Sequence, residues 1–505
     1  MSLKSLLSFT LHYLGFFSKE KLIASFVALR EQYVELANKS DALKDKNQEL
    51  EQEINRLKAA DCKRQIQSVN KTVNQPSSKQ PEWELKGVGN DGQGKRKGRG
   101  KKGRKGAGNK TKEHTVTHHE TAKVTVCDNC GKDLREQAPL KSENIRIIED
   151  IPLIPEVQEI EVRQEKKYCS DCKKVVTASS ELALPKTDLG LNTTIKVLYL
   201  WISCCLPYTR ISSYMNIFFG HIISTTGLSS LVIRVSKIFQ PVYEELLEDV
   251  KSSSQLHADE SGWRVNGDLW WLWVFGNSDS AYYTIENSRG SDVVRKIIGE
   301  IFSGVLIVDG WSAYMFLLCK KQSCMAHLLR KIRALHFAFP NLGSVFKFYI
   351  KFRKILRDGE SLQLQRKELG EEVFKRRLDK LYHRLDELLK WPHPNSILKE
   401  IIEKVDRQRP HILTFVEYQG VPCHNNFAEG LIRKGVLKRK VSFGSKSQQG
   451  AEAYSILLSI NTTCQLRNIS FVDFLQLSLK HYIRTGNPML LKEYMTLRAN
   501  LEMAA

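Results

Sequence analysis

Long apolar runs, a surplus of acidic charge and a cleavage signal are what this sequence lacks. No segment approaches the ~18 apolar residues of a membrane span, so we expect none. The apolar start, SLLSFTLHYLGFF, is interrupted by His12 and followed by SKEKL without a small-residue cleavage pattern, which argues against a signal peptide. Acidic residues number 56 against 77 Lys and Arg, a net charge of +21. This balance favours a polyanionic partner, most commonly nucleic acid.

The length and composition indicate a globular protein of several domains. At about 150 residues per domain, 505 residues allow roughly three. The hydrophobic content of 42% is ordinary for a protein with a real core. The 11 cysteines suit a reduced cytosolic protein in which some of them bind metal.

A leucine repeat fills the first segment, residues 1–62. Leucines recur every seven residues and alternate with a second series four residues later, as Leu22, Leu29, Leu36, Leu43, Leu50 and Leu57 with Phe26, Tyr33, Ser40, Asn47 and Ile54. No Gly or Pro interrupts them. The pattern predicts a coiled coil that forms a homodimer or higher oligomer, with Asn47 favouring a parallel dimer. The alternative is one long amphipathic helix packed on its own domain.

A basic segment lies within residues 63–120. From Lys86 to Lys112 the chain has eleven Lys and Arg against one Asp, with nine glycines, so it is expected to be disordered when free. It is either a solvated linker or, as the charge favours, a linker that grips DNA phosphates. The cations predicted to bind DNA here are Lys95, Arg96, Lys97, Arg99, Lys101, Lys102, Arg104 and Lys105.

Two CxxC pairs lie in residues 121–184. Cys127 with Cys130 and Cys169 with Cys172 have the spacing of zinc knuckles, in which four thiolates hold one tetrahedral ion. The alternatives are two disulfides or independent redox pairs. We interpret the four cysteines as a structural zinc site without an open coordination position.

Residues 185–250 have a helical pattern with a turn at Gly220. The second helix of the pair could begin at a cap near Thr225 or Thr226. This suits a helix-turn-helix that offers Ser229, Ser230 and Arg234 to DNA, and it suits an ordinary helical bundle equally well.

The segment 251–330 carries two candidate metal-binding acids on strands. QLHADESGWRV, LWWLWVF and AYYTIE read as strands, SDVVRKIIGEIF as a helix and GVLIVDGWSAY as a buried strand, a β-β-β-α-β order. If the first and fourth strands are neighbours, Asp259 and Asp309 come together. Carboxylate oxygens are the ligands that Mg²⁺ prefers, and a bound ion would explain an acid inside a strand.

A third acid lies in residues 421–475. Asn425 and Glu429 are four residues apart on one helical face, and Glu429 is followed by basic residues, among them Arg433, Lys434, Lys438, Arg439 and Lys440. An acid in such a helix suits a metal site beside a phosphodiester backbone, so these cations are predicted to bind DNA. Alone, Glu429 would be read as a surface salt bridge.

Four blocks carry a resemblance to a known family. HADESGWRV, VDGWSAY, CMAHLLRK and NNFAEGLIRKGVLKRKVSFGSKS resemble the signature blocks of the insertion sequence 66 family of bacterial transposases, and the order of segments matches along nearly the whole chain. One departure is Gly430, where relatives more often have Arg. The resemblance implies an α/β (mixed α+β) fold with a ribonuclease-H-like catalytic core and a helical insertion at 331–420, before a C-terminal helical tail at 476–505.

The resemblance also implies a DDE chemistry. Asp259, Asp309 and Glu429 would be the catalytic triad and would hold two Mg²⁺ or Mn²⁺ ions. Residues expected to support the site are Cys324, His327, Arg330, Asn425 and Asn426. For Cys324 and His327 a core pair at a strand-to-helix junction is an equal alternative to bracing the active site or contacting DNA.

The leading functional hypothesis is a DNA transposase of a bacterial insertion sequence. It would act on double-stranded DNA, both the terminal inverted repeats and the target, in the cytoplasm at the nucleoid, with accessory proteins of the same element. The alternatives are a non-catalytic DNA-binding or regulatory protein on the same scaffold and a structure-selective nuclease without strand transfer.

Overall fold

The chain is a mixed α/β protein. The computed structural model describes scattered positions between 24 and 50, residues 125, 130–136 and 157–504, apart from residues 172, 179, 311, 340–341 and 393–395. The described residues belong to two compact units, Met1–Gly87 with Gln322–His424 and Val88–Lys321 with Asn425–Ala505. None of the described helices is long and apolar enough to cross a membrane.

In the described part of the second unit, four helices precede the sheet. After a small antiparallel hairpin, β1 (Lys166–Cys169) and β2 (Lys174–Thr177), come α4 (Leu191–Ile202), α5 (Tyr208–Phe219), α6 (Thr225–Ile238) and α7 (Gln240–Lys251). Gly220 ends α5 in the left-handed conformation, as the predicted turn requires. The cap of α6 is Ser224, whose hydroxyl accepts from Gly227 N at 3.0 Å, so the helix begins slightly earlier than predicted.

A five-stranded mixed sheet forms the centre of this unit. Its order is β5-β4-β3-β6-β7, from β3 (Gln255–Val265), β4 (Asp268–Gly276), β5 (Ala281–Glu286), β6 (Ile301–Val308) and β7 (Leu318–Ser323). Strand β4 is antiparallel to β3 and β5, whereas β6 pairs in parallel with β3. The predicted β-β-β-α-β order is therefore confirmed, and the first and fourth of these strands are neighbours in the sheet.

The helix between β5 and β6 is shorter than predicted. Helix α8 (Ser291–Ile298) ends at Gly299, which has a φ of +96°, and the next strand already begins at Ile301. The sequence had assigned Ile301 and Phe302 to the helix. The glycine was the signal for the end, because it adopts a backbone angle that continues no helix.

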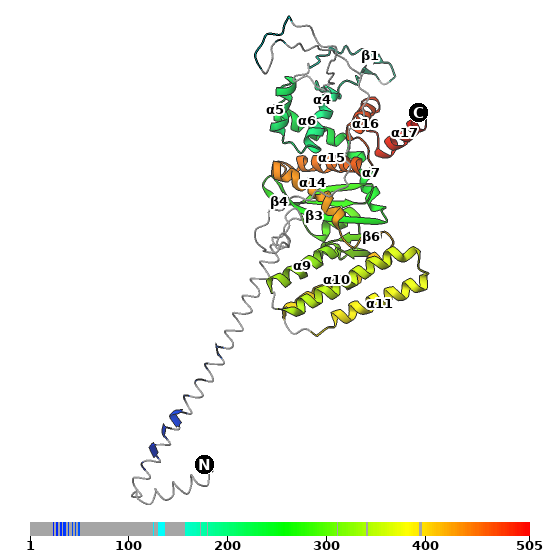
Figure 1. Ribbon diagram of the computed structural model, residues 1–505. Helices are drawn as coiled ribbons and strands as arrows, with labels where there is room; N and C mark the ends of the chain where they lie inside the picture. The colour runs from blue at the N-terminus through cyan, green and yellow to red at the C-terminus, as the bar shows by residue number, and fades with distance from the viewer. Residues whose placement is uncertain are drawn as a thin grey trace, which may run out of the picture. The chain divides into compact units, whose positions relative to one another are not determined.

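Helices α14 (Asn426–Ser442) and α15 (Gln448–Leu466) cover the sheet in Figure 1. Most of α15 is buried. Its Ser and Thr hydroxyls accept hydrogen bonds from backbone N–H groups at the edge of β5, where no neighbouring strand is present among the described residues. Tyr283 N donates to Ser459 Oγ at 2.8 Å and Ala281 N to Thr463 Oγ1 at 3.1 Å. An exposed edge would invite pairing with another chain, so this contact closes it.

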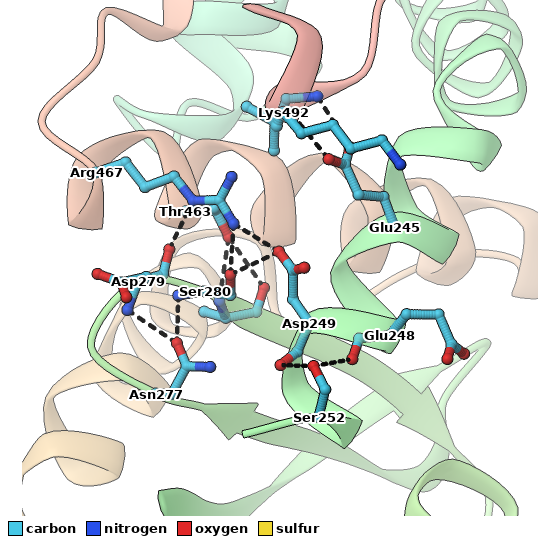
Figure 2. Close-up of polar contacts among 12 residues, drawn as sticks. Glu245, Glu248, Asp249, Ser252, Asn277, Asp279, Ser280, Thr463, Arg467 and Lys492 are labelled. Carbon is cyan, nitrogen blue, oxygen red and sulfur yellow. Dashed lines mark hydrogen bonds and ion pairs between the residues drawn. The ribbon is translucent and has the colours of Figure 1, made fainter. Parts of the chain in front are cut away.

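A polar network joins α7, the β4–β5 turn and the end of α15 (Figure 2). Arg467 Nη2 donates to Asp249 Oδ2 at 2.5 Å and to Ser280 Oγ at 2.7 Å. Asn277 Oδ1 accepts from the backbone N–H groups of Asp279 and Ser280 and so shapes the turn. The following helices are α16 (Phe471–Thr485) and α17 (Leu491–Ala504), and Glu245 accepts from the first backbone amides of α17.

The first unit is helical over its described part of residues 322–424. It contains α9 (Met325–Ala338), α10 (Gly343–Leu364), α11 (Glu371–Leu389), α12 (Ser396–Arg407) and α13 (Thr414–Glu417), of which α9, α10 and α11 lie side by side in Figure 1. Gln363 Nε2 donates to the carbonyls of Phe415 and Val421 at 2.7 and 2.9 Å, which fixes α10 on the segment after α12. Helices therefore make up most of the described part of residues 331–420, the segment expected to be a helical insertion.

The described positions between 24 and 50 are helical. Leu36, Leu43 and Leu50 of the predicted seam are 70%, 65% and 54% exposed, and Lys39 pairs with Glu35 at 2.7 Å. The other seam positions lie outside the described residues, so the coiled coil stays a prediction. The basic residues from Lys95 to Lys105 also lie outside the described residues.

Candidate active site

The register of β3 and β6 places two acids at the same level. His257 on β3 lies opposite Ile307 on β6, and Asp259 and Asp309 each follow two residues later along parallel directions. Neighbouring strands are about 4.8 Å apart, so these two acids occupy adjacent positions on one side of the sheet. Asp309 directly follows the last residue of β6, where the chain leaves the sheet.

Helix α14 carries the third acid and is fixed to β3 at its start. The buried Asn425 side chain donates from Nδ2 to the Ala258 carbonyl at 2.8 Å and lies 2.9 Å from His257 Nδ1 through its Oδ1. Glu429 follows one turn later, and its backbone N–H donates to the Asn425 carbonyl. The contact of Asn425 with residues beside Asp259 supports the expectation that Asn425 positions the site.

A glycine lets the same helix lie close to the sheet. A Cβ added at Gly435 would come within 2.1 Å of Leu272 Cδ2 on β4. Because Leu272 has no exposed surface, a larger residue would push α14 away from the strands. Glu429, on the same helix, is therefore placed in part by Gly435.

Asp259 has the electrostatic environment of a metal ligand. Burial raises the pKa of Asp259 well above its ordinary value, and the charges of Glu260, Asp309 and Glu429 raise it further. Asp309 and Glu429 are therefore close enough to Asp259 for their charges to act on it. A backbone N–H, that of Glu260, donates to Asp259 at 2.9 Å, and among the described residues no Lys or Arg forms an ion pair with it. Such an oxygen donor set fits Mg²⁺ or Mn²⁺.

The carboxylate of Glu260, the neighbour of Asp259, is hydrogen-bonded by two protein side chains that the sequence analysis did not predict. Arg289 donates to Glu260 Oε1 from Nε and Nη2 at 3.0 and 2.8 Å, and Tyr314 donates to Oε2 at 2.7 Å. Burial and the charge of Asp309 raise the pKa of Glu260, whereas the bonds from Tyr314 and Arg289 lower it. Arg289 also lies over the ring of Trp271, 4.6 Å from its centre.

The predicted cations of α14 fall into different environments. Arg433 and Lys440 are exposed, as a DNA contact requires. Lys434 is half-buried and donates to Gln465 Oε1 at 2.5 Å, and Arg439 donates to the Gly262 carbonyl and to a hydroxyl on β3.

Lys438 does not fit the prediction of a DNA contact. Its side chain is buried, and Nζ donates to the carbonyls of Trp201 and Leu206 at 3.1 and 2.8 Å. Burial lowers the pKa of Lys438 to about 8. The ammonium group serves the end of α4, whose last carbonyls lack partners within the helix.

The remaining predicted site residues differ in burial and position. Cys324 is buried at the cap position of α9, and His327 and Arg330 are half-buried on that helix. Asn426 is exposed at the start of α14. Cys130 is exposed and Cys169 ends β1, whereas Cys127 and Cys172 lie outside the described residues, so the zinc site stays a prediction.

The fold and site define a mixed α/β protein with an acidic centre on a central sheet, beside a basic helix. The chain belongs to the transposase IS66 family, whose sequence model matches residues 188–453, more than half of the chain, with all three acids inside the match.

Three curated relatives come from Sinorhizobium fredii (strain NBRC 101917 / NGR234), and each is named an uncharacterized protein. The protein y4qI is 25% identical over 48% of this chain and 50% of its own length, and y4hP is 23% identical over 68% of each chain. The protein y4jO is 31% identical over 15% of this chain and 24% of its own length. The chain therefore spans about half of y4qI and about two thirds of y4hP.

Proposed function

We propose that this chain is a DDE-type DNA transposase that cuts phosphodiester bonds at the ends of an insertion sequence and joins the freed 3′-hydroxyl to target DNA. The observation that supports the proposal is the level position of Asp259 and Asp309 on adjacent parallel strands, together with Glu429 on α14, whose charge raises the pKa of Asp259. The sheet order, with one strand antiparallel and one parallel to β3, supports a ribonuclease-H-like core.

Each of the three acids would act through its oxygens. Asp259 and Asp309, level on adjacent strands, would hold divalent ions between them, and Glu429 would close the set from α14. When bound, two such ions would activate the attacking oxygen and stabilise the leaving one. Glu260, tied to Arg289 and Tyr314, would keep β3 in place while the neighbouring acid binds and releases its ligand.

DNA would be recognised mainly through its charge. The exposed Arg433 and Lys440 lie on the helix that carries Glu429, and the basic segment from Lys95 to Lys105 adds further cations. Affinity should therefore fall steeply with salt. Two protomers would be paired through the leucine repeat, and Cys127, Cys130, Cys169 and Cys172 would hold a structural zinc ion.

The decisive experiment replaces one acid and follows binding and cutting separately. Asp309→Asn in the full chain should abolish Mg²⁺-dependent cleavage of a plasmid carrying the element's ends while end binding persists. The control is Asp268→Asn, an exposed acid at the start of β4, which should cut like the unmodified protein. Cleavage retained by Asp309→Asn would disprove the assignment.

Two further outcomes separate the alternative functions. Pre-cleaved duplexes ending in a 3′-hydroxyl, mixed with Mg²⁺ and a target plasmid, are joined by a transposase and left unjoined by a nuclease. A protein that binds the ends but neither cuts nor joins under any divalent ion would be a non-catalytic DNA-binding protein.

A further inference from the structure

The exposed side of α14 is unusual for a solvated helix. The exposed positions between Glu429 and the end of the helix recur at intervals of three and four and form one face, the α14 stripe: Gly430, Arg433, Leu437, Lys440 and Val441. Leu437 is 51% and Val441 41% exposed. A helix face in water is ordinarily polar, so cations interleaved with aliphatic side chains call for a partner.

Phe443, just beyond the helix, combines two unfavourable features. Its backbone has a φ of +62° and a ψ of −9°, the left-handed conformation that glycine normally supplies at a helix end. Its side chain is 80% exposed although it is a large apolar ring. Strained backbone and an exposed aromatic at one position point to a role in binding.

The turn that holds Phe443 is pinned to β3. Gly444 lies so close to the strand that an added Cβ would come within 2.2 Å of the Arg264 carbonyl oxygen. Ser445 N donates to that same oxygen at 2.8 Å, and Asn266 N donates to the Ser445 carbonyl at 2.9 Å. Trp263 Nε1 also donates to Ser445 Oγ at 3.2 Å. Phe443 therefore projects from a fixed platform.

The charge around this platform selects a polyanion. From Gly430 to Ser447 the sequence contains no acidic residue, and Arg433, Lys440 and Lys446 are exposed along it. Arg264, on the adjoining strand, is exposed as well. An aromatic ring among cations is the combination that stacks on a nucleic-acid base while the cations contact phosphates.

The distance from the acids sets where along DNA this contact falls. Phe443 follows Glu429 by 14 residues on α14, a rise of about 21 Å. On β3, Val265 follows Asp259 by six residues, again about 20 Å, and Val265 and Ser445 form a parallel bridge. At about 3.4 Å per nucleotide, a separation of about 20 Å between the acids and Phe443 corresponds to roughly six nucleotides of DNA.

We propose that DNA lies along the α14 stripe and that Phe443 stacks on a base about six nucleotides from the reacting phosphate, unstacking it from its neighbour. This inference rests on the proposed function, because the acids must hold the reacting phosphate for the spacing to apply.

The test uses the full chain and a duplex of the element's end that terminates in the pre-cleaved 3′-hydroxyl, without target DNA. 2-Aminopurine, a base whose fluorescence rises when it unstacks, is placed at each position from the second to the tenth nucleotide. The unmodified protein should give a rise centred near the sixth nucleotide. Phe443→Ala should lose it and bind roughly five- to a hundredfold more weakly, whereas Phe443→Trp should keep it.

Two controls separate stacking from charge. Ile301→Ala removes an apolar side chain that is 73% exposed at the start of β6, elsewhere in the same unit, and should change nothing. Phe443→Ala should weaken binding with an unchanged salt dependence, whereas Arg433→Ala should lower the salt slope by about one. Binding and fluorescence of Phe443→Ala equal to those of the unmodified protein would overturn the inference.

A third variant excludes an effect on folding. Phe443→Gly relieves the left-handed backbone, so its melting temperature should equal or exceed that of the unmodified protein while the fluorescence signal is lost. A fall in melting temperature that accompanies the loss of signal would assign Phe443 to the fold instead. If the unmodified protein cleaves DNA and Phe443→Ala matches it in binding and fluorescence, the stacking role of Phe443 is wrong but the proposed function stands. If the unmodified protein binds DNA but never cleaves it, the proposed function itself is wrong.

Discussion

Two identical substitutions on α14 should have opposite effects on stability. Gly435→Ala adds a methyl group that would lie 2.1 Å from Leu272 Cδ2 in a fully buried contact with β4. Gly430→Ala adds the same group on the exposed side of the helix, where nothing lies within 4 Å. The first change should destabilise the unit that holds the acids and the second should stabilise it.

The magnitudes follow from two terms. Ala in place of Gly stabilises a helix interior by about 0.8–1 kcal/mol, and this gain applies at both positions. Forcing an extra methyl group into a packed core costs about 1–3 kcal/mol, and this cost applies only at Gly435. The two variants should therefore differ by the steric cost alone, about 1–3 kcal/mol. With ~2–4 °C per kcal/mol for a unit of this size, their melting temperatures should differ by roughly 2–12 °C.

The assay is thermal unfolding of the full chain followed by tryptophan fluorescence, with Mg²⁺-dependent cleavage measured in parallel. Gly435→Ala should also lose more cleavage than Gly430→Ala, because displacement of α14 moves Glu429 relative to the two strand acids. Shortening the opposing side chain, Leu272→Ala, should make Gly435→Ala less harmful than it is alone. Equal melting temperatures for the two glycine variants would refute the close packing of α14 on β4.

Three other outcomes are expected. Asp259→Asn should have a higher melting temperature than the unmodified protein when no metal is present. In the unmodified protein, Mg²⁺ at a hundredfold excess over Kd should stabilise the fold by about 2.7 kcal/mol, and Asp259→Asn should abolish this stabilisation. An equal effect of Mg²⁺ on both proteins would show that Asp259 is not a ligand. Arg467→Ala should cost about 2 kcal/mol in denaturant unfolding because it breaks the charged contact with Asp249, whereas Arg498→Ala, at an exposed pair, should cost under ~0.5 kcal/mol. The folded pKa of Lys438, about 8, lies below the ~10.4 of an unfolded lysine, so the unfolded chain binds more protons between these values and stability should rise with pH there. Lys438→Met should flatten that rise in urea unfolding at pH 7.5–10.

The order of elements around the acids could be predicted because it depends on local patterns. The strands and the amphipathic helix could be predicted from the apolar pattern of residues 255–308. The parallel direction of β6 follows because α8 connects it to β5, which runs in the same direction as β3. The choice of Glu429 rests on its place in a basic helix together with the two strand acids and the family resemblance, since alone it would be read as a surface salt bridge. Its position depends on Gly435, whose close approach to Leu272 has no local signal.

The partners of charged side chains could not be predicted in the same way. Arg289 and Tyr314 are 29 and 54 residues from Glu260 in the sequence. Arg289 lies in the loop before α8, and Tyr314 ends a short 3-10 helix, Ser312–Tyr314. Lys438 was read as one of several cations facing DNA. Its burial depends on the carbonyls at the end of α4, more than two hundred residues away. A charge pattern predicts the sign of a surface but not which members of the pattern lie on it.

The two adjacent carboxylates of β3 are held in opposite ways, and this difference makes the strand suitable for metal-dependent chemistry. Glu260 is buried, and Arg289 and Tyr314 hydrogen-bond to it, so its charge is compensated by the protein itself. Asp259 receives a backbone N–H and faces other acids, so its charge is best compensated by a ligand that the protein does not supply. In the proposed function, Glu260 would keep β3 in place whether or not Asp259 holds an ion. The site would then release its ions and products without losing the geometry that the next reaction requires.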